Sequence, residues 1–235
     1  MALEGNGKKQ ALKVKNHFNS DFIDYDTCDE FVVPKNDELH EVIVDFIPFA
    51  KEEKFHALDL GVGTGTGAFK ILKYYPNAFL TGVDFSRKMI SRAEEKLKRF
   101  NDRVKLIEGD FNAMKFPEKY DFIYSAVAIH NNRDEEKRNL FNKIFDSLNE
   151  NCFFINGDFF KSSNERVQKK FNEFYRDLLE RNLSGRESEA WIRHAFEEDK
   201  PSTIEEQFSW LEEIGFKEMH CIWQYYNTTV YYAKK

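Results

Sequence analysis

Glycines recur at every second position in one short stretch of the chain, directly after an apolar run. Residues 58–67 read LDLGVGTGTG, so that Asp59 is followed by a series of glycines that begins at Gly61. Glycine adopts left-handed backbone conformations and allows a ligand to approach the backbone closely. A second apolar run, residues 79–83, ends in Asp84. A glycine turn after one strand and an acid at the tip of the next predict a doubly wound α/β sheet that binds an adenosine-containing cofactor.

The glycine spacing leaves two kinds of cofactor open. Counted from Gly61 the dinucleotide pattern fails, but counted from Gly63 a permitted variant with alanine in the last position is satisfied. Asp59 stands where the pyrophosphate of a dinucleotide disfavours an acid. S-adenosylmethionine (SAM) has no phosphate; an acid suits its cationic end, and loop N–H groups suit its carboxylate. The acid therefore favours SAM.

Four motifs along the chain resemble those of the class I SAM-dependent methyltransferases, the seven-stranded Rossmann-like family, and specifically its small-molecule type. In the family's order and spacing they are residues 58–67, 83–86, 108–111 and 120–126. The ending, residues 210–216 and then Tyr225 and Tyr226, is also similar. The resemblance covers most of the chain. It implies one domain over residues 1–235, with a mainly parallel, doubly wound seven-stranded sheet and helices on both faces.

The same resemblance implies roles for individual residues in SAM binding. Asp84 is expected to bond both ribose hydroxyls, although it could instead cap the following helix in competition with Ser86. Asp110 is expected near the adenine amino group. Phe85 and Met89 are expected to flank the adenine, with a place in the core as the alternative for Met89. The full set of predicted cofactor-binding residues is Asp59, Gly61, Gly63, Thr64, Gly65, Asp84, Phe85, Met89, Asp110, Phe111, Ser125 and Tyr25.

Hydrophobic periodicity predicts alternating strands and helices, which implies a mainly parallel sheet. Strands are expected over residues 56–60, 78–84, 104–108, 120–126 and 152–156, with a final antiparallel pair over 218–224 and 228–233. Helices are expected over residues 37–49, 67–75, 86–100 and 133–148, and over 202–215, where residues 202–205 have a capping-box pattern.

Residues 159–200 depart from this alternation. They are polar and carry an apolar helical stripe, which Gly185 is expected to interrupt before a second helix over residues 187–196. In the family, such inserts and the N-terminal segment cover the cofactor and shape the acceptor site. Residues 159–200 are therefore predicted to form a helical lid, and residues 1–50 an N-terminal cap that contains Tyr25.

His130 is the candidate catalytic residue. It follows the fourth predicted strand, where this fold exposes residues to the reacting centre, and a histidine there can remove a proton from an acceptor. It could equally orient the loop through a bond to the backbone. The tetrad typical of amino-directed methyltransferases is replaced by SAVA at residues 125–128, and no Pro-Cys pair occurs. Strand four offers Asp158 no partner carboxylate, so no metal is implied.

Composition narrows the partners. The chain has 41 acidic and 35 basic residues, which argues against a nucleic-acid partner. Three widely spaced cysteines indicate reduced thiols and a cytoplasmic location. No apolar run approaches the ~20 residues that span a bilayer, so no membrane partner is expected. The oligomeric state stays open, a homodimer included.

The predicted function is methyl transfer from SAM to a small-molecule acceptor, with S-adenosylhomocysteine (SAH) as the product. One alternative is another SAM-using enzyme of the same fold, similar to carboxy-SAM synthases. A protein or RNA methyltransferase and a non-catalytic SAM-binding domain also stay open. An NAD-dependent oxidoreductase is the remaining alternative, although the chain has no Tyr-x-x-x-Lys pair at residues 120–128.

Overall fold

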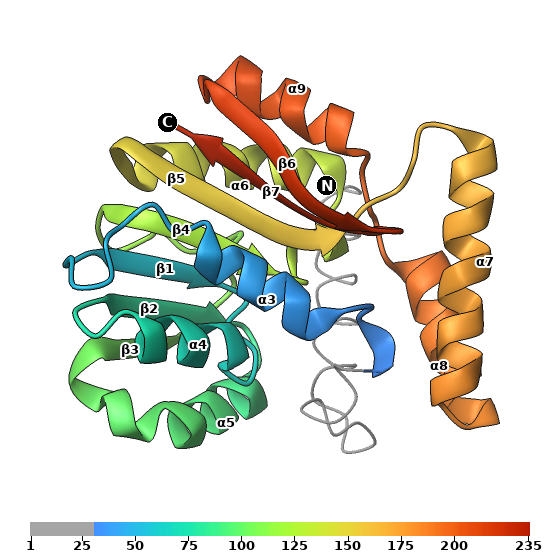
Figure 1. Ribbon diagram of the computed structural model, residues 1–235, viewed down its shortest axis with the longest axis horizontal. Helices are drawn as coiled ribbons and strands as arrows, with labels where there is room; N and C mark the ends of the chain where they lie inside the picture. The colour runs from blue at the N-terminus through green and yellow to red at the C-terminus, as the bar shows by residue number, and fades with distance from the viewer. Residues whose placement is uncertain (1–30) are drawn as a thin grey trace, which may run out of the picture.

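The computed structural model describes residues 31–235, which contain a seven-stranded sheet (Figure 1). Its strand order is β3-β2-β1-β4-β5-β7-β6. The bounds are β1 His56–Leu60, β2 Phe79–Asp84, β3 Val104–Glu108, β4 Tyr120–Ala126, β5 Leu148–Phe159, β6 Glu218–Tyr225 and β7 Thr228–Lys234. The first five strands pair in parallel, and β7 runs antiparallel to both β5 and β6. The expected mainly parallel, doubly wound sheet is confirmed.

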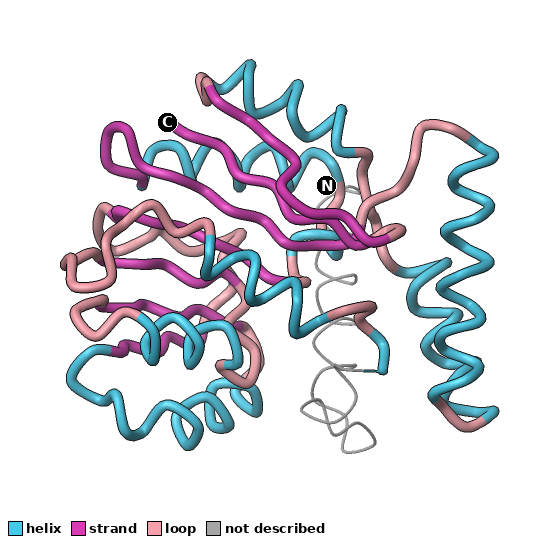
Figure 2. The backbone as a smooth tube through the Cα atoms, in the orientation of Figure 1, coloured by secondary structure: helices cyan, strands magenta, loops and turns pink. Residues whose placement is uncertain are grey.

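Helices cover both faces of the sheet, as Figures 1 and 2 show. One face carries α3 (Asn36–Asp45), α4 (Thr66–Tyr74) and α5 (Arg87–Leu97). The other face carries α6 (Asp134–Ser147) and α9 (Ile204–Ile214). The short 3-10 segments η1 (Lys98–Arg103) and η2 (Ile129–Asn131) precede β3 and follow β4. Each layer of helices closes its own apolar cluster against the sheet.

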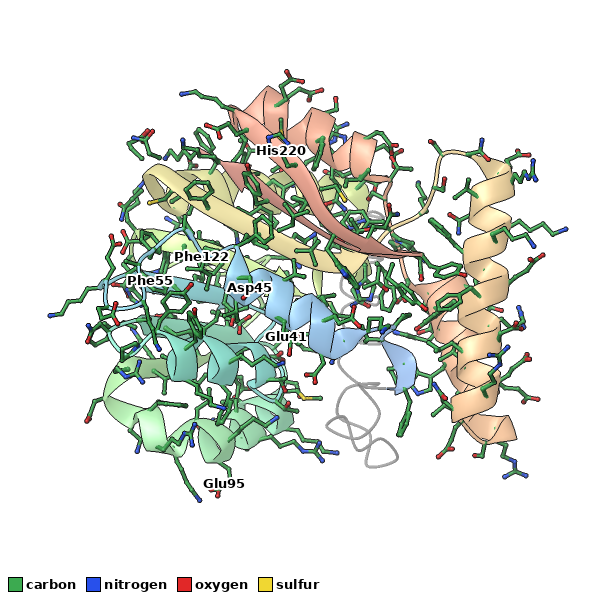
Figure 3. All side chains as sticks on the ribbon, in the orientation of Figure 1. Glu41, Asp45, Phe55, Glu95, Phe122 and His220 are labelled. Carbon is green, nitrogen blue, oxygen red and sulfur yellow. The ribbon has the colours of Figure 1, made fainter. Side chains whose placement is uncertain are left out.

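The central strands are buried on both faces, as expected of parallel strands between two helical layers. In β1 every residue after His56 is buried, and β4 is buried from Phe122 to Ser125. Figure 3 labels Phe122 within this buried layer, whereas Glu95 projects outward from α5. Because no polar face is left on these strands, polar side chains that do occur there need partners inside the protein.

The strand order reverses between β1 and β4. From β1 the chain continues to β2 and β3 on one side, whereas β4 and β5 lie on the other side. In open α/β sheets, ligands bind at the carboxyl ends of the strands at such a switch point. The turn after β1 and the loop after β4 therefore mark the place to search for a site.

Several element boundaries differ from the predicted ones. Helix α3 ends at Asp45 instead of residue 49, because Phe46 leaves the helical conformation with its side chain exposed. Strand β5 extends to Phe159, because its pairing with β7 continues over that length. The capping box of α9 lies one residue later than predicted: Thr203 and Glu206 each accept the other's backbone N–H, at 3.1 and 2.8 Å.

Residues 159–200 form helices outside the two layers (Figure 1). They comprise α7 (Glu165–Asn182), α8 (Gly185–Arg193) and the short π-helical segment η3 (His194–Glu198). Gly185 begins α8 instead of interrupting a helix; the break falls before it, where Ser184 forms a capping box with Glu187. Of the helices described, none is both long and apolar enough to cross a membrane.

Candidate functional site

The glycine turn joins β1 to α4 in a conformation that other residues rarely adopt. Gly61, Gly63 and Gly65 all have positive φ angles, of 83°, 53° and 88°. A Cβ atom on Gly61 would lie 2.5 Å from the Cβ of Ala128, which follows β4. The turn is therefore pressed against the loop after β4 so closely that only glycine fits at its start.

Asp84 at the end of β2 is tied to this turn. Its Oδ2 accepts the backbone N–H of Gly63 at 3.0 Å, and its Oδ1 accepts that of Ser86 at 2.8 Å. Burial raises the pKa of Asp84, while these two backbone donors act in the opposite direction. Each carboxylate oxygen can accept a second hydrogen bond. The side chain of Ser86 accepts the N–H of Met89 and so caps α5, which means that Asp84 is not needed as the cap of this helix. Asp84 can therefore accept further hydrogen bonds from a ligand with hydroxyl groups.

Asp59 lies beneath the turn, with its side chain only 2% exposed. The hydroxyl of Tyr124, its register partner on β4, donates to Asp59 Oδ2. Burial raises the pKa of Asp59 to about 7; the Tyr124 hydrogen bond lowers it and the charge of Asp84 raises it. Tyr124 was not among the predicted site residues, although aligning β1 with β4 in a parallel register would have indicated it.

The segment after β3 brings two more predicted residues to the same end of the sheet. Asp110 is exposed, and its Oδ1 accepts the N–H of Asn112 at 2.8 Å. Phe111 is buried, and its ring lies 3.8 Å from the Cβ position of Gly61. The backbone N–H of Gly109 donates to the carbonyl of Asp84 at 2.9 Å. The ends of β1, β2 and β3 are thus connected.

Other predicted residues have side chains that serve the fold. Ser125 is fully buried and its hydroxyl donates to the carbonyl of Leu60 at 2.8 Å. Thr64 is buried and accepts from the Lys96 ammonium at 2.9 Å. Met89 is 3% exposed, which favours a place in the core, and Phe85 is half-buried. Contact of these side chains with a cofactor stays a prediction, and Tyr25 lies outside the described residues.

His130 lies in η2 and is buried against β5. Its backbone N–H donates to Asp158 Oδ2 at 2.8 Å, and its Nδ1 is 2.6 Å from Asp158 Oδ1. Its Nε2 is 3.2 Å from the amide nitrogen of Asn131 and 3.7 Å from Asp199 Oδ1. Burial lowers the pKa of His130, but the charges of Asp158 and Asp199 outweigh burial and raise it overall.

The helical segment 159–200 contacts this histidine. Asp199 Oδ1 lies 3.2 Å from Nε2 of His194, so Asp199 stands between two histidines. The ring of Phe159 packs edge-on against the ring of His130 and also contacts the ring of Tyr175 in α7. The Tyr175 hydroxyl donates to the carbonyl of Val32 at 2.8 Å. No sequence pattern indicated Asp199 as a site residue, because it lies far from His130 along the chain.

The described residues fit SAM as a cofactor. A Cβ atom on Gly63 would meet nothing nearer than the carbonyl oxygen of Gly61, at 4.0 Å, so the turn leaves open space next to the Asp84 carboxylate. Asp110 adds an exposed carboxylate at the end of the neighbouring strand. Across residues 31–235 no cluster of three or more histidine, cysteine or acidic side chains could hold a metal ion.

Sequence comparisons identify proteins related to this chain. A family model described as a methyltransferase domain matches residues 57–151. The carboxy-S-adenosyl-L-methionine synthase of Nautilia profundicola is 27% identical over 209 residues, covering 86% of this chain and 87% of the relative. The synthase of the same name from Helicobacter pylori (strain J99) is 31% identical over 180 residues, covering 75% of this chain and 73% of the relative.

Solved structures share the fold. The S-adenosylmethionine-dependent methyltransferase SibL in its apo form has a TM-score of 0.63 and 16% identity, covering 83% of this chain and 54% of that one. PigF with SAH has a TM-score of 0.59 and 18% identity, with the same coverage of 83% and 54%. This chain thus spans about half the length of those two proteins. The chain belongs to the class I SAM-dependent methyltransferase family, and it is an enzyme whose cofactor is SAM.

Proposed function

We propose that this enzyme transfers a methyl group from SAM to a small-molecule acceptor. The observation that carries the proposal is the Asp84 carboxylate, which two backbone N–H groups hold beside a glycine turn that is open at Gly63. A bound SAM supplies a methyl group already activated on a positively charged sulfur. The protein must therefore bind, orient the acceptor and exclude water, and orientation alone contributes about 7–11 kcal/mol to lowering such barriers.

Each polar group of the site has a proposed task in holding SAM. Asp84 accepts hydrogen bonds from the ribose hydroxyls, and Asp110 accepts one from the adenine amino group. The N–H groups of residues 61–65 bind the carboxylate of the amino-acid end. Asp59 lies beneath the cationic end: its raised pKa keeps it partly protonated near pH 7, and the positive charge of bound SAM favours the ionised form, which stabilises that end.

His130 is the proposed proton acceptor. Asp158 fixes the ring through Nδ1, so that Nε2, which lies 3.2 Å from the amide nitrogen of Asn131, is the nitrogen proposed to take a proton from an acceptor. Since the ring is only 5% exposed, access to it requires residues 159–200 to move, which is consistent with their proposed role as a lid. We also retain the proposal of one domain over residues 1–235 with a cap formed by residues 1–50, of which residues 1–30 lie outside the described residues.

Carboxy-SAM synthesis is the second candidate function. It is favoured by the name of the two relatives, one of which matches 86% of this chain. The charges around His130 argue against it, because two acids face one histidine there. A new carboxylate next to this group would be repelled, because two acids face one histidine and even a protonated His130 compensates only one of them.

Mass spectrometry of the SAM-derived product distinguishes the two functions. The enzyme would be incubated with SAM and either a set of small phenols, amines, acids and thiols or a set of organic acids that can give up a carboxyl group. Methyl transfer yields SAH, whereas carboxylation yields SAM that is heavier by one CO₂ unit.

Calorimetric binding completes the test. Binding of SAM and SAH that Asp84→Ala abolishes supports the cofactor site, and binding of NADH without SAM would contradict it. SAH binding without turnover in either set would support a non-catalytic domain or a macromolecular acceptor over the proposed reaction.

A further inference from the structure

The segment that carries Asp110 and Phe111 is not part of the sheet. It lies in the connection between β3 and β4, residues 109–119, where no strand pairing fixes the backbone. Its first turn closes locally: the carbonyl of Asp110 accepts the N–H groups of Ala113 and Met114 at 3.0 and 2.9 Å. These bonds shape the turn but do not attach it to the rest of the protein.

Lys143 supplies the attachment. Its ammonium group reaches from α6 and donates to three backbone carbonyls of the turn, those of Phe111, Asn112 and Met114, the last two at 3.0 and 2.8 Å. An ammonium group has three donors, so these bonds use all of them. Hydrogen bonds from a charged donor are about twice as strong as neutral ones. Burial lowers the pKa of Lys143, and the charge of Asp110 acts in the opposite direction.

A second tie holds the same turn from the other side. The side chains of Asn112 and Asn132 donate to each other, at 2.9 and 3.3 Å. Asn132 is buried directly after η2, the segment that contains His130. The turn is therefore anchored both to α6 and to the loop after β4.

We propose that Lys143 is a positioning residue for cofactor binding. It holds the turn of residues 110–114 in place, so that Asp110 can accept a hydrogen bond from the adenine amino group. This inference rests on the proposed function. The side chain of Phe111 is buried in the core, whereas Asp110 is exposed, so the fold would survive without Lys143. The loss would instead fall on a contact that needs the Asp110 carboxylate in one place.

The test compares two ligands that differ at the adenine. Calorimetry would measure the dissociation constants of SAH and of S-inosylhomocysteine, in which oxygen replaces the amino group. Lys143→Met keeps the aliphatic stem and removes the donors. SAH affinity should fall about tenfold to hundredfold, the range for losing a hydrogen bond to a charged group, and the preference for SAH over the inosine ligand should shrink with it.

Arg138→Met is the matched control. It removes one positive charge from the same helix, and its side chain contacts Glu213 and Trp210 instead of the turn. It should bind both ligands as the native chain does. If Lys143→Met does not fold, Lys143→Leu, which also removes the donors, serves in its place with the same expected loss of preference.

The outcomes separate this inference from the proposed function. Failure of the native chain to bind SAH would refute the function itself. Where the native chain binds SAH and prefers it, an unchanged preference in the Lys143 variant overturns the positioning role alone. An equal loss for both ligands with a lower melting temperature would show general destabilisation, which also overturns it.

Discussion

Replacing Asp59 by asparagine should change how the stability of the protein depends on pH. Asp59 is 2% exposed and accepts a hydrogen bond from Tyr124, and its pKa is raised from 3.8 to about 7. In the unfolded chain the same carboxyl group ionises near its ordinary value. Between these two values the native state keeps a proton that the unfolded state has lost.

The size and sign of the effect follow from this difference. The pKa of Asp59 rises from 3.8 in the unfolded chain to about 7 in the native state, and each tenfold change in the ionisation constant corresponds to about 1.36 kcal/mol. Above pH 7, ionisation of Asp59 therefore destabilises the native state by about 4 kcal/mol. Protonated Asp59 contributes fully to the stability of the native state below the pKa that this group has in the unfolded chain. The contribution is lost as the pH rises through the pKa that Asp59 has in the native state. Asparagine does not titrate, so Asp59→Asn removes this loss.

Urea unfolding of the native chain and of Asp59→Asn at pH 5 and pH 8 measures the effect. All other titrating groups are common to both proteins, so the difference between their unfolding free energies isolates Asp59. That difference should grow by about 2–3 kcal/mol in favour of the variant from pH 5 to pH 8. A difference that stays constant with pH would refute the reasoning.

Four further predictions concern the site. At pH 6, SAH binding should release a fraction of a proton from Asp59, because the positively charged amino group of SAH lowers the pKa of that carboxyl group. Calorimetry in two buffers of different ionisation enthalpy measures the proton release. Asp59→Asn should abolish the release. Asp84→Asn should weaken SAH binding about tenfold or more, seen by titration, since one acceptor becomes a donor. Gly61→Ala should lower the melting temperature and SAH affinity, because its left-handed backbone alone costs about 1–2 kcal/mol and the new Cβ would meet Ala128 at 2.5 Å. The turnover rate should rise with pH through an apparent pKa above 6.5, because the pKa of His130 is raised. His130→Gln should lower the turnover rate about 10²–10⁴-fold without changing SAH affinity, and an unaffected rate would contradict the role of His130 as base.

Local sequence patterns were enough to predict the sheet and the edge of the sheet at which the site lies. The glycine series from Gly61 and the acid Asp84 are local patterns, and each has only a few backbone conformations available. Because parallel strands end at the same edge, the ends of β1, β2 and β3 had to come together. The strands of the sheet and the helix capped by Ser86 therefore follow from the pattern of residues.

The partners of the buried groups could not be predicted from sequence patterns and became visible in the folded structure. Tyr124 bonds Asp59 across 65 positions in the chain, and His130 meets Asp158 across 28. Such contacts depend on strand register and helix packing, which periodicity does not fix. The same holds for Lys143. In the sequence it is indistinguishable from other lysines of a predicted helix, and its contact with the turn of residues 110–114 results from the packing of α6 beside that turn.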